Sequence, residues 1–339
     1  VDNFVFKPFA AYDFDIVLNR VTRTSSGPDS IPYWFIKACA FYLSPVLCKI
    51  VNFSLTTSCV PAAWKQATIT PVPKRHLFAT HPTFDLSLLP HFYHVSPKRS
   101  SSENFLRLSS PHLLFMTNTP INRLALQLAL LSTSQTEYPC FLNNNSCVRC
   151  VFIDFTKAFD MVDHAVLVDK LSHLSVPNLV IKWIVAFLTD RTQATRLNSV
   201  LSSLLKINRS IIQGSGIGPV LFIMFANDLK AIGSMNYILK YADDSSLLCP
   251  EKSPVTAENE MENIIRWSQE NKLLINMLKT KEMVFHQPNP RLYIEPPAMQ
   301  NIERVNEFKL LGVYFCSDLR FNSHISKVLT ICNQRLYFN

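Results

Sequence analysis

The chain has 339 residues, of which 48% are hydrophobic, so it can bury a core and is too apolar to be an intrinsically disordered protein. Its 33 Lys and Arg residues against 25 Asp and Glu give a formal net charge of +8, which permits a polyanionic partner such as nucleic acid without requiring one. The apolar run at residues 220–226 is far shorter than the ~18 residues that a membrane helix needs. We therefore expect a folded protein with no membrane segment.

The nine cysteines are odd in number and scattered. The spacing Cys147-x-x-Cys150 has no second pair that would complete a zinc site, so reduced thiols in an intracellular compartment are expected. No signal peptide heads the chain, and the absence of an initiating Met indicates a fragment.

The first third of the chain predicts helices, loops and one edge strand. Proline suits the first turn of a helix, so a helix is expected from Pro32, followed by a second over residues 45–57. The stretch 64–74, with prolines near its end, predicts an edge strand that carries basic residues. The first helix has apolar residues at helical spacing that predict a packing face: Trp34, Phe35, Ala38, Phe41 and Tyr42.

Residues 75–118 have a different character. They hold five of the nine His residues and keep neither a helical nor a strand period. A structureless loop of this length is rare inside a compact domain, so the stretch is either an inserted loop or a frameshifted segment. An apolar helix is expected again over residues 120–131.

The middle of the chain alternates strands with helices. Residues 147–155 predict a central strand, because the apolar run 151–153 does not alternate. Asp154 ends this strand, where a carboxylate is costly unless it is paired or bound to a metal. The following pattern predicts helices over 164–174 and 180–188 and then a hairpin region over 191–212.

A glycine-rich turn at residues 213–219 opens an apolar helix that is expected over 220–229. Such a turn can bring the backbone close to a phosphate, but it can also be only a tight turn. The motif alone leaves both interpretations open.

Asp243 and Asp244 lie between two short apolar runs, 237–239 and 247–249, which predicts the turn of a β-hairpin. Adjacent carboxylates repel each other, and such a turn needs only one Asp or Asn beside a Gly. A hard divalent cation such as Mg²⁺ would remove the conflict. After the hairpin we expect a helix capped by Thr256, strands over 282–285 and 308–314, and a basic helix from residue 321.

This order of elements predicts an α+β fold in which a β-α-β-β-α-β alternation packs helices on an antiparallel sheet. The first strand then lies beside the hairpin, so Asp154, Asp243 and Asp244 come together. Three carboxylates can hold two Mg²⁺ ions about 3.5 to 4 Å apart, one activating a hydroxyl and one stabilising a leaving pyrophosphate. That arrangement is typical of a nucleic acid polymerase.

On the set of segments taken together, the chain resembles the reverse transcriptase of LINE-type (non-LTR) retrotransposons. The resemblance covers most of the chain outside residues 75–118. The segments that carry it are residues 25–32, 64–74, 152–164, 213–219, 241–244, 276–281 and 310–313.

The resemblance implies a right-hand polymerase fold with fingers, a ferredoxin-like palm and a truncated thumb. The expected division is an N-terminal helical extension and the start of the fingers at 1–56, a reverse transcriptase domain at 57–316, and the start of the thumb at 317–339. The implied activity is RNA-directed DNA polymerisation with RNA template, DNA primer and deoxynucleoside triphosphates as partners. The implied location is the nucleus or cytoplasm, in a ribonucleoprotein.

The resemblance also implies the metal site. Asp154, Asp243 and Asp244 would bind two Mg²⁺ ions, with Mn²⁺ as an alternative ion and the carbonyl of Phe155 assisting. Lys279 would protonate or neutralise pyrophosphate, and its alternative role is a solvated surface charge.

Four further positions are implied to bind substrate. Phe159 would act as a steric gate that excludes the ribose 2′-hydroxyl, and its alternative role is ordinary core packing. Gln213 and Gly214 would contact the nucleotide and template, and Tyr241 would lie near the primer terminus.

The chain departs from the family pattern at residues 75–118, which keep no intact Tyr-Arg-Pro segment. Residues 113–117 read Leu-Leu-Phe-Met-Thr where an Arg that grips the triphosphate is expected. Losing that Arg would remove a stabiliser of the transferred phosphoryl group. The alternative is therefore a catalytically inactive nucleic-acid-binding remnant. A metal-dependent nuclease or phosphatase is disfavoured, because neither needs the glycine-rich turn or the gate.

Overall fold

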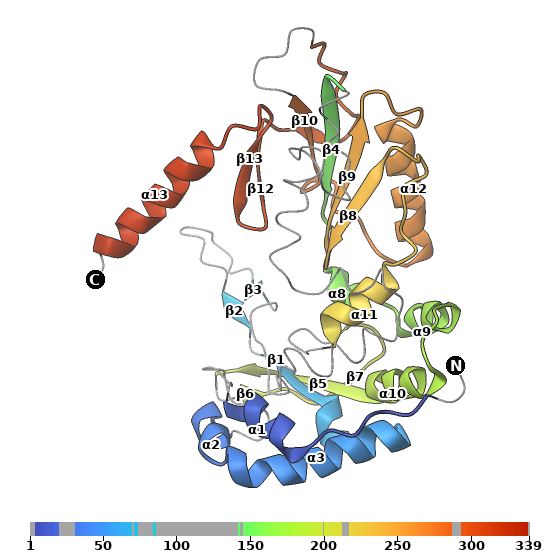
Figure 1. The fold of residues 1–339 in the computed structure, drawn as a ribbon, viewed down its shortest axis with the longest axis vertical. Coiled ribbons are helices and arrows are strands. Elements are labelled where there is room, and N and C mark those ends of the chain that lie inside the picture. Colours follow the sequence, from blue (N-terminus) through green and yellow to red (C-terminus); the bar gives the residue numbers. More distant parts are fainter. Residues whose placement is uncertain are drawn as a thin grey trace. The chain divides into compact units, whose positions relative to one another are not determined.

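The computed structural model describes residues 4–19, 31–69, 71–73, 84–85, 142, 145–198, 200–211, 217–286 and 293–337. The chain divides into two compact units (Figure 1). The first unit comprises Val1–Thr117 and Phe159–Ala226, and the second comprises Asn118–Ala158 and Asn227–Asn339. Most of the divergent stretch 75–118 and the helix expected over 120–131 lie outside the described residues.

The second unit contains a five-stranded sheet with the order β11-β10-β4-β9-β8. Strand β4 lies between β9 and β10 and is antiparallel to both, and β8 pairs with β9 as a hairpin. This order confirms the predicted β-α-β-β-α-β arrangement. The elements are β4 (Cys147–Ile153), β8 (Tyr237–Tyr241), β9 (Asp244–Pro250), α12 (Ala257–Glu270), β10 (Lys281–His286) and β11 (Glu303–Arg304).

Strand β4 lies at the centre of the sheet, and nearly all of its side chains are buried, as its apolar sequence predicts. Val148, Cys150 and Phe152 form a core with Leu248 and Met283 from the neighbouring strands. Burying a side chain of the size of Phe152 contributes about 1.5 to 3 kcal/mol. The sheet is therefore held together at the strand that directly precedes Asp154.

Helix α12 begins where the sequence predicts. The Thr256 side chain accepts a hydrogen bond from the Asn259 amide at 3.3 Å, and Glu258 and Glu260 lie in the first turn. The helix packs against β9 (Figure 1).

The single strand expected over residues 308–314 is wrong. The chain instead forms a hairpin of β12 (Glu307–Leu310) and β13 (Val313–Cys316). Leu311 and Gly312 between them have φ angles of 48° and 88°, and a two-residue hairpin turn favours positive φ. Phe308 of this hairpin stacks on Phe152 at 4.1 Å and so covers the core. A final helix, α13, spans Asn322–Tyr337 and confirms the helix expected from residue 321.

The first unit combines helices with a small sheet in which β1 lies at the edge, parallel to β5. The region expected as a hairpin is confirmed, since β5 pairs with both β6 and β7. The elements are α1 (Ala11–Asn19), α2 (Tyr33–Ala38), α3 (Ala40–Thr57), a 3₁₀ turn (Ala62–Lys65), β1 (Gln66–Ile69), β2 (Val72–Pro73), β3 (Phe84–Asp85), α8 (Ala158–Met161), α9 (His164–His173), α10 (Asn178–Leu188), β5 (Arg191–Leu197), β6 (Val200–Leu201), β7 (Leu205–Ile207) and α11 (Gly218–Phe225).

Three boundaries differ from expectation. The second helix begins at Ala40 with Pro45 inside it, the helix after the glycine-rich turn ends at Phe225, and the strand expected over 64–74 is divided into a 3₁₀ turn and two short strands. Helix ends depend on caps and packing that periodicity does not report.

The packing face expected for the helix from Pro32 is also wrong. Trp34 of α2 and Phe41 at the start of α3 are 60% and 76% exposed. Helix α3 is anchored through other residues, since Trp183 of α10 donates a hydrogen bond to Ser54 at 3.1 Å and Asn52 accepts one from the Phe9 amide at 2.9 Å. Helical spacing identified the aromatic residues, but the buried residues of α3 are small or polar and give no apolar period.

Candidate active site

The hairpin of β8 and β9 ends in a two-residue turn of Ala242 and Asp243. Tyr241 pairs with Asp244 across the strands. Ala242 has a φ of 51°, a left-handed conformation that such turns favour and that is costly for most side chains. The turn therefore presents Asp243 at its tip and begins β9 with Asp244, and both residues are partly exposed.

Asp154 follows directly after β4, which pairs with β9 in a register that sets Ile153 opposite Ser245. Continuing that register by one position sets Asp154 opposite Asp244. Opposed residues in an antiparallel ladder have Cα atoms roughly 4.5 to 5.5 Å apart. The topology thus brings together carboxylates from two segments that are far apart in sequence.

The three carboxylates affect one another. Partial burial raises the pKa of Asp244 to about 6, and the negative charges of Asp243 and Asp154 add to this rise. The pKa of Asp243 is also raised, first by burial and further by Asp154, while a backbone hydrogen bond opposes the rise. Concentrated negative charge of this kind favours either protonation or a bound cation.

The raised pKa of Asp244 predicts a pH-dependent stability. Its folded-state pKa of about 6 exceeds the ordinary value of 3.8, so the folded chain binds more protons between these pH values. Without metal, the free energy of unfolding should therefore fall as the pH rises through this window. Urea unfolding at pH 4, 5, 6 and 7 measures this free energy, which should fall less with pH in the Asp244→Asn variant than in the parent chain. Identical pH dependence in the two proteins would contradict the raised pKa of Asp244.

Lys279 comes from the turn between α12 and β10, and its Nζ lies 3.7 Å from Oδ2 of Asp154. The Lys279 side chain is 67% exposed and that of Asp154 is 37% exposed, and a pair this open adds about 0 to 1 kcal/mol at most. The contact therefore matters for the charge that it places beside Asp154 rather than for stability.

Phe155 and Tyr241 lie beside these charges. Phe155 is 6% exposed, its ring packs edge-on against Trp267 at 6.2 Å, and its backbone forms an antiparallel bridge with Ile275. Tyr241 is half-buried at the end of β8. The second unit thus gathers six predicted site residues: Asp154, Phe155, Tyr241, Asp243, Asp244 and Lys279.

The remaining three predicted residues are Phe159, Gln213 and Gly214. Phe159 belongs to the first unit, where its ring stacks on Phe222 at 4.9 Å and its carbonyl accepts a hydrogen bond from Ile211 at 2.8 Å. Gln213 and Gly214 lie outside the described residues. The proposed roles of these three residues stay predictions.

Comparison with known protein families gives a match over residues 115–315 to the family described as reverse transcriptase (RNA-dependent DNA polymerase). The match covers more than half of the chain. The chain belongs to the reverse transcriptase family. The matched residues include the whole five-stranded sheet of the second unit and helix α12.

Similar curated sequences come from non-LTR retrotransposons of Drosophila melanogaster. The RNA-directed DNA polymerase from mobile element jockey is 28% identical over 201 residues, which are 55% of this chain and 22% of that protein. The probable RNA-directed DNA polymerase from transposon BS is 25% identical over 201 residues, 56% of this chain and 22% of that protein. This reverse transcriptase chain thus spans about a fifth of the length of these relatives.

Among solved structures, telomerase from Candida tropicalis in complex with a fragment of telomeric RNA has a TM-score of 0.47 and 13% identity, covering 83% of this chain and 49% of that one. The insertion-loop deletion mutant of a human picobirnavirus RNA-dependent RNA polymerase has a TM-score of 0.37 and 16% identity, covering 64% and 37%.

The donor set suits a hard divalent cation, because it consists of carboxylate oxygens, and burial together with neighbouring negative charge raises the pKa of Asp243 and Asp244. Within the described ranges, no group of three His, Cys, Asp or Glu side chains is arranged so that it could hold a metal ion. Without a cation the three carboxylates repel one another, and Lys279 lies beside one oxygen of Asp154. The three carboxylates fit divalent ions in their chemistry.

Two buried residues of the second unit carried no predicted role. Glu260 is fully buried and accepts hydrogen bonds from the Gly233 amide at 2.7 Å and from the Asn236 side chain at 2.9 Å, which anchors the segment that leads into β8. Thr280 is also fully buried and contacts the backbone of Asp154. The sequence signal for Glu260 was its place beside the apolar residues of α12.

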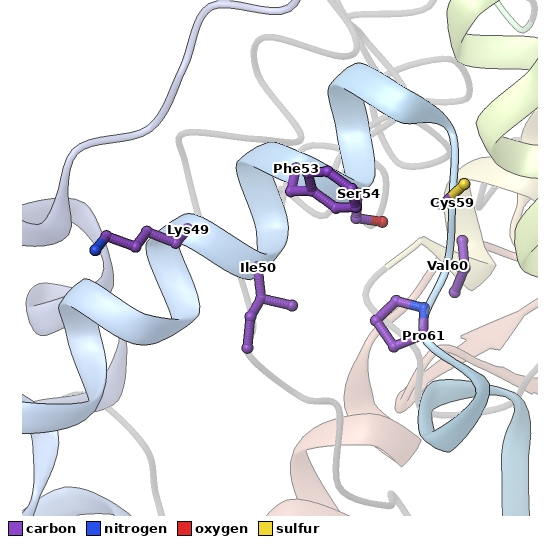
Figure 2. Close-up of a pocket in the computed structure, with 7 residues that line it drawn as sticks. All are labelled: Lys49, Ile50, Phe53, Ser54, Cys59, Val60 and Pro61. Carbon is purple, nitrogen blue, oxygen red and sulfur yellow. The ribbon is translucent and has the colours of Figure 1, made fainter.

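The reverse transcriptase chain has a pocket of about 500 Å³ in the first unit, and none of the predicted site residues lines it. Figure 2 shows its residues, which come from α3 and from the loop that follows that helix. They are Lys49, Ile50, Phe53, Ser54, Cys59, Val60 and Pro61. In the part of the chain that the structure describes, no helix has the length and apolar character needed to cross a membrane.

Proposed function

We propose that this chain is the RNA-directed DNA polymerase domain of a non-LTR retrotransposon, which adds deoxynucleotides to a primer 3′-hydroxyl under the direction of an RNA template. The observation that carries the proposal is the pairing of β4 with β9, which puts Asp154 next to the Asp243 and Asp244 turn. Family membership and the names of the relatives support the reaction type.

The proposed chemistry assigns each side chain a role. Asp154, Asp243 and Asp244 would hold two Mg²⁺ ions, and those ions would supply Lewis acidity for attack by the primer hydroxyl and for departure of pyrophosphate. Lys279 contributes positive charge beside Asp154, where charge develops on the leaving group. Tyr241 lies at the end of the hairpin and supports the primer terminus.

We further propose that the partners are an RNA template, a DNA primer and deoxynucleoside triphosphates, and that the enzyme acts in the nucleus or cytoplasm as a ribonucleoprotein. The net charge of +8 suits a polyanionic partner. The test is extension of a labelled DNA primer on an RNA template with Mg²⁺ and deoxynucleotides. Extension supports the polymerase, and its absence contradicts it.

A second function, a catalytically inactive remnant that binds nucleic acid, is favoured by one observation. Residues 113–117 read Leu-Leu-Phe-Met-Thr and lack the Arg that the family pattern leads us to expect. Such a protein would bind primer and template with a steep salt dependence and show no extension.

The proposed gate makes a separate prediction. Replacing Phe159 with Ala should raise incorporation of ribonucleotides relative to deoxynucleotides by about tenfold or more, because the ring no longer obstructs the 2′-hydroxyl. The control is Phe222→Leu, which disturbs the ring stacked on Phe159 but leaves the gate side chain in place. Single-nucleotide incorporation with each sugar measures the ratio. If Phe159→Ala lowers both rates equally, the residue acts only in packing.

A further inference from the structure

The turn that precedes β10 runs beside the chain just after β4. The Asn276 amide donates a hydrogen bond to the carbonyl of Asp154 at 2.7 Å, and the Thr156 amide donates one to the carbonyl of Leu274, also at 2.7 Å. Phe155 and Ile275 form the antiparallel bridge between these two bonds. The backbone that carries Asp154 is therefore continued as a short ladder beyond the end of the strand.

Thr280 closes this ladder from the other side. Its hydroxyl donates to the Asn276 carbonyl at 2.9 Å and accepts from the Asp154 amide at 3.4 Å. The residue is 0% exposed, so water does not replace either bond without opening the turn. The β-branch of Thr restricts its rotamers, which favours this one placement of the hydroxyl.

The same turn places Lys279. Its amide donates to the Asn276 side-chain oxygen at 3.3 Å and to the Asn276 carbonyl at 3.1 Å, and its ammonium reaches the Asp154 carboxylate. Both backbone polar groups of Asp154 and the cation beside its side chain are thus held by one five-residue turn, Asn276 to Thr280. Movement of this turn would shift the carboxylate and its cation together.

We infer that Thr280 is a positioning residue. Its buried hydroxyl fixes the backbone of Asp154 and so pre-organises the Asp154 carboxylate to bind a divalent ion. The inference rests on the proposed function, because it assigns Asp154 to a metal site. Preset ligands bind tighter than mobile ones, since less ordering accompanies binding. Thr280 acts through Asp154 and touches no reacting atom.

The experiment compares Thr280→Val, which keeps the branched shape but removes the hydroxyl, with Thr280→Ser, which keeps the hydroxyl. Ser268→Ala is the matched control, because it removes another buried hydroxyl of the same unit, one that bonds only within α12 to Ile265 at 2.7 Å. Mn²⁺ alone is titrated into each full chain by electron paramagnetic resonance. Hydrogen exchange of the Asp154 amide and the free energy of unfolding are measured on the same samples.

Thr280→Val should raise the Mn²⁺ dissociation constant about fivefold, the equivalent of one net hydrogen bond, and should speed exchange of the Asp154 amide. Thr280→Ser should stay within about twofold of the parent chain, and Ser268→Ala should change neither quantity. A purely structural role would lower stability and leave the dissociation constant unchanged.

The inference is overturned if Thr280→Val binds Mn²⁺ like the parent chain, or if the Val and Ser variants weaken binding equally. The proposed function fails in a different way. If the parent chain binds no Mn²⁺, or if Asp243→Asn binds it as tightly as the parent, the carboxylate site itself is absent, and the role of Thr280 is overturned with it.

Discussion

Replacing Asp243 with Asn abolishes primer extension on an RNA template. We expect a loss of at least about 10³-fold, because the substitution removes one of three charges that stabilise the reacting centre while leaving the turn geometry intact. Asn tolerates turn positions as well as Asp does, so the hairpin should still form. Single-turnover extension with saturating Mg²⁺ measures the effect.

Asp190→Asn is the matched control for this substitution. Asp190 has a φ of 54°, a conformation that Asn adopts readily, and its 72% exposed side chain lies 3.9 Å from Lys206. The chemical change is the same but occurs in the first unit at an exposed ion pair, so extension should stay within about twofold. Equal losses in the two variants would show that the effect is not specific to the carboxylate cluster.

The largest effect on stability is expected at Glu282. This side chain is 0% exposed and is bound by Arg304 at 2.7 Å, by Arg149 at 3.1 Å and by the Met299 amide at 3.1 Å. Glu282→Gln would leave two largely buried guanidinium groups without their shared carboxylate. Arg149 keeps Glu258 and Arg304 keeps Glu295 as a partner, so the substitution should cost about 1.5 to 3 kcal/mol. Hydrogen exchange of β4 and β10 amides in the parent chain and the variant measures this loss in the second unit.

An exposed carboxylate on the neighbouring strand provides the comparison. Glu303 of β11 pairs with Lys281 at 2.5 Å, and its side chain is 67% exposed. Glu303→Gln should cost less than about 1 kcal/mol by the same exchange measurement. If the two substitutions cost the same, burial of the Glu282 network does not control the stability of the sheet.

The sheet of the second unit was predictable because each step had a local signal. An apolar run without alternation indicated the central strand, and two short apolar runs around Asp243 and Asp244 indicated the hairpin. Alternation of strands and helices then limited the topology to one in which β4 lies beside β9. The proximity of Asp154 to the hairpin follows from that topology and from no single motif.

Other features depended on packing that the sequence does not display. Gly312 lies at a hairpin turn, but a lone Gly among apolar residues also fits the interior of a strand. The large apolar residues of α2 are exposed, whereas α3 buries small and polar residues such as Ser44 and Ser54, and apolar periodicity does not indicate such a packed face. Thr280 matters through the backbone of a residue 126 positions away, a contact that only the folded chain reveals.

The most direct test of the carboxylate cluster is X-ray diffraction from crystals soaked in Mn²⁺, with anomalous data collected at the manganese edge. Two anomalous peaks should appear about 3.5 to 4 Å apart, in contact with carboxylate oxygens of Asp154, Asp243 and Asp244. Peaks elsewhere, with these three side chains bound only to water or to Lys279, would contradict a two-metal polymerase site in this chain.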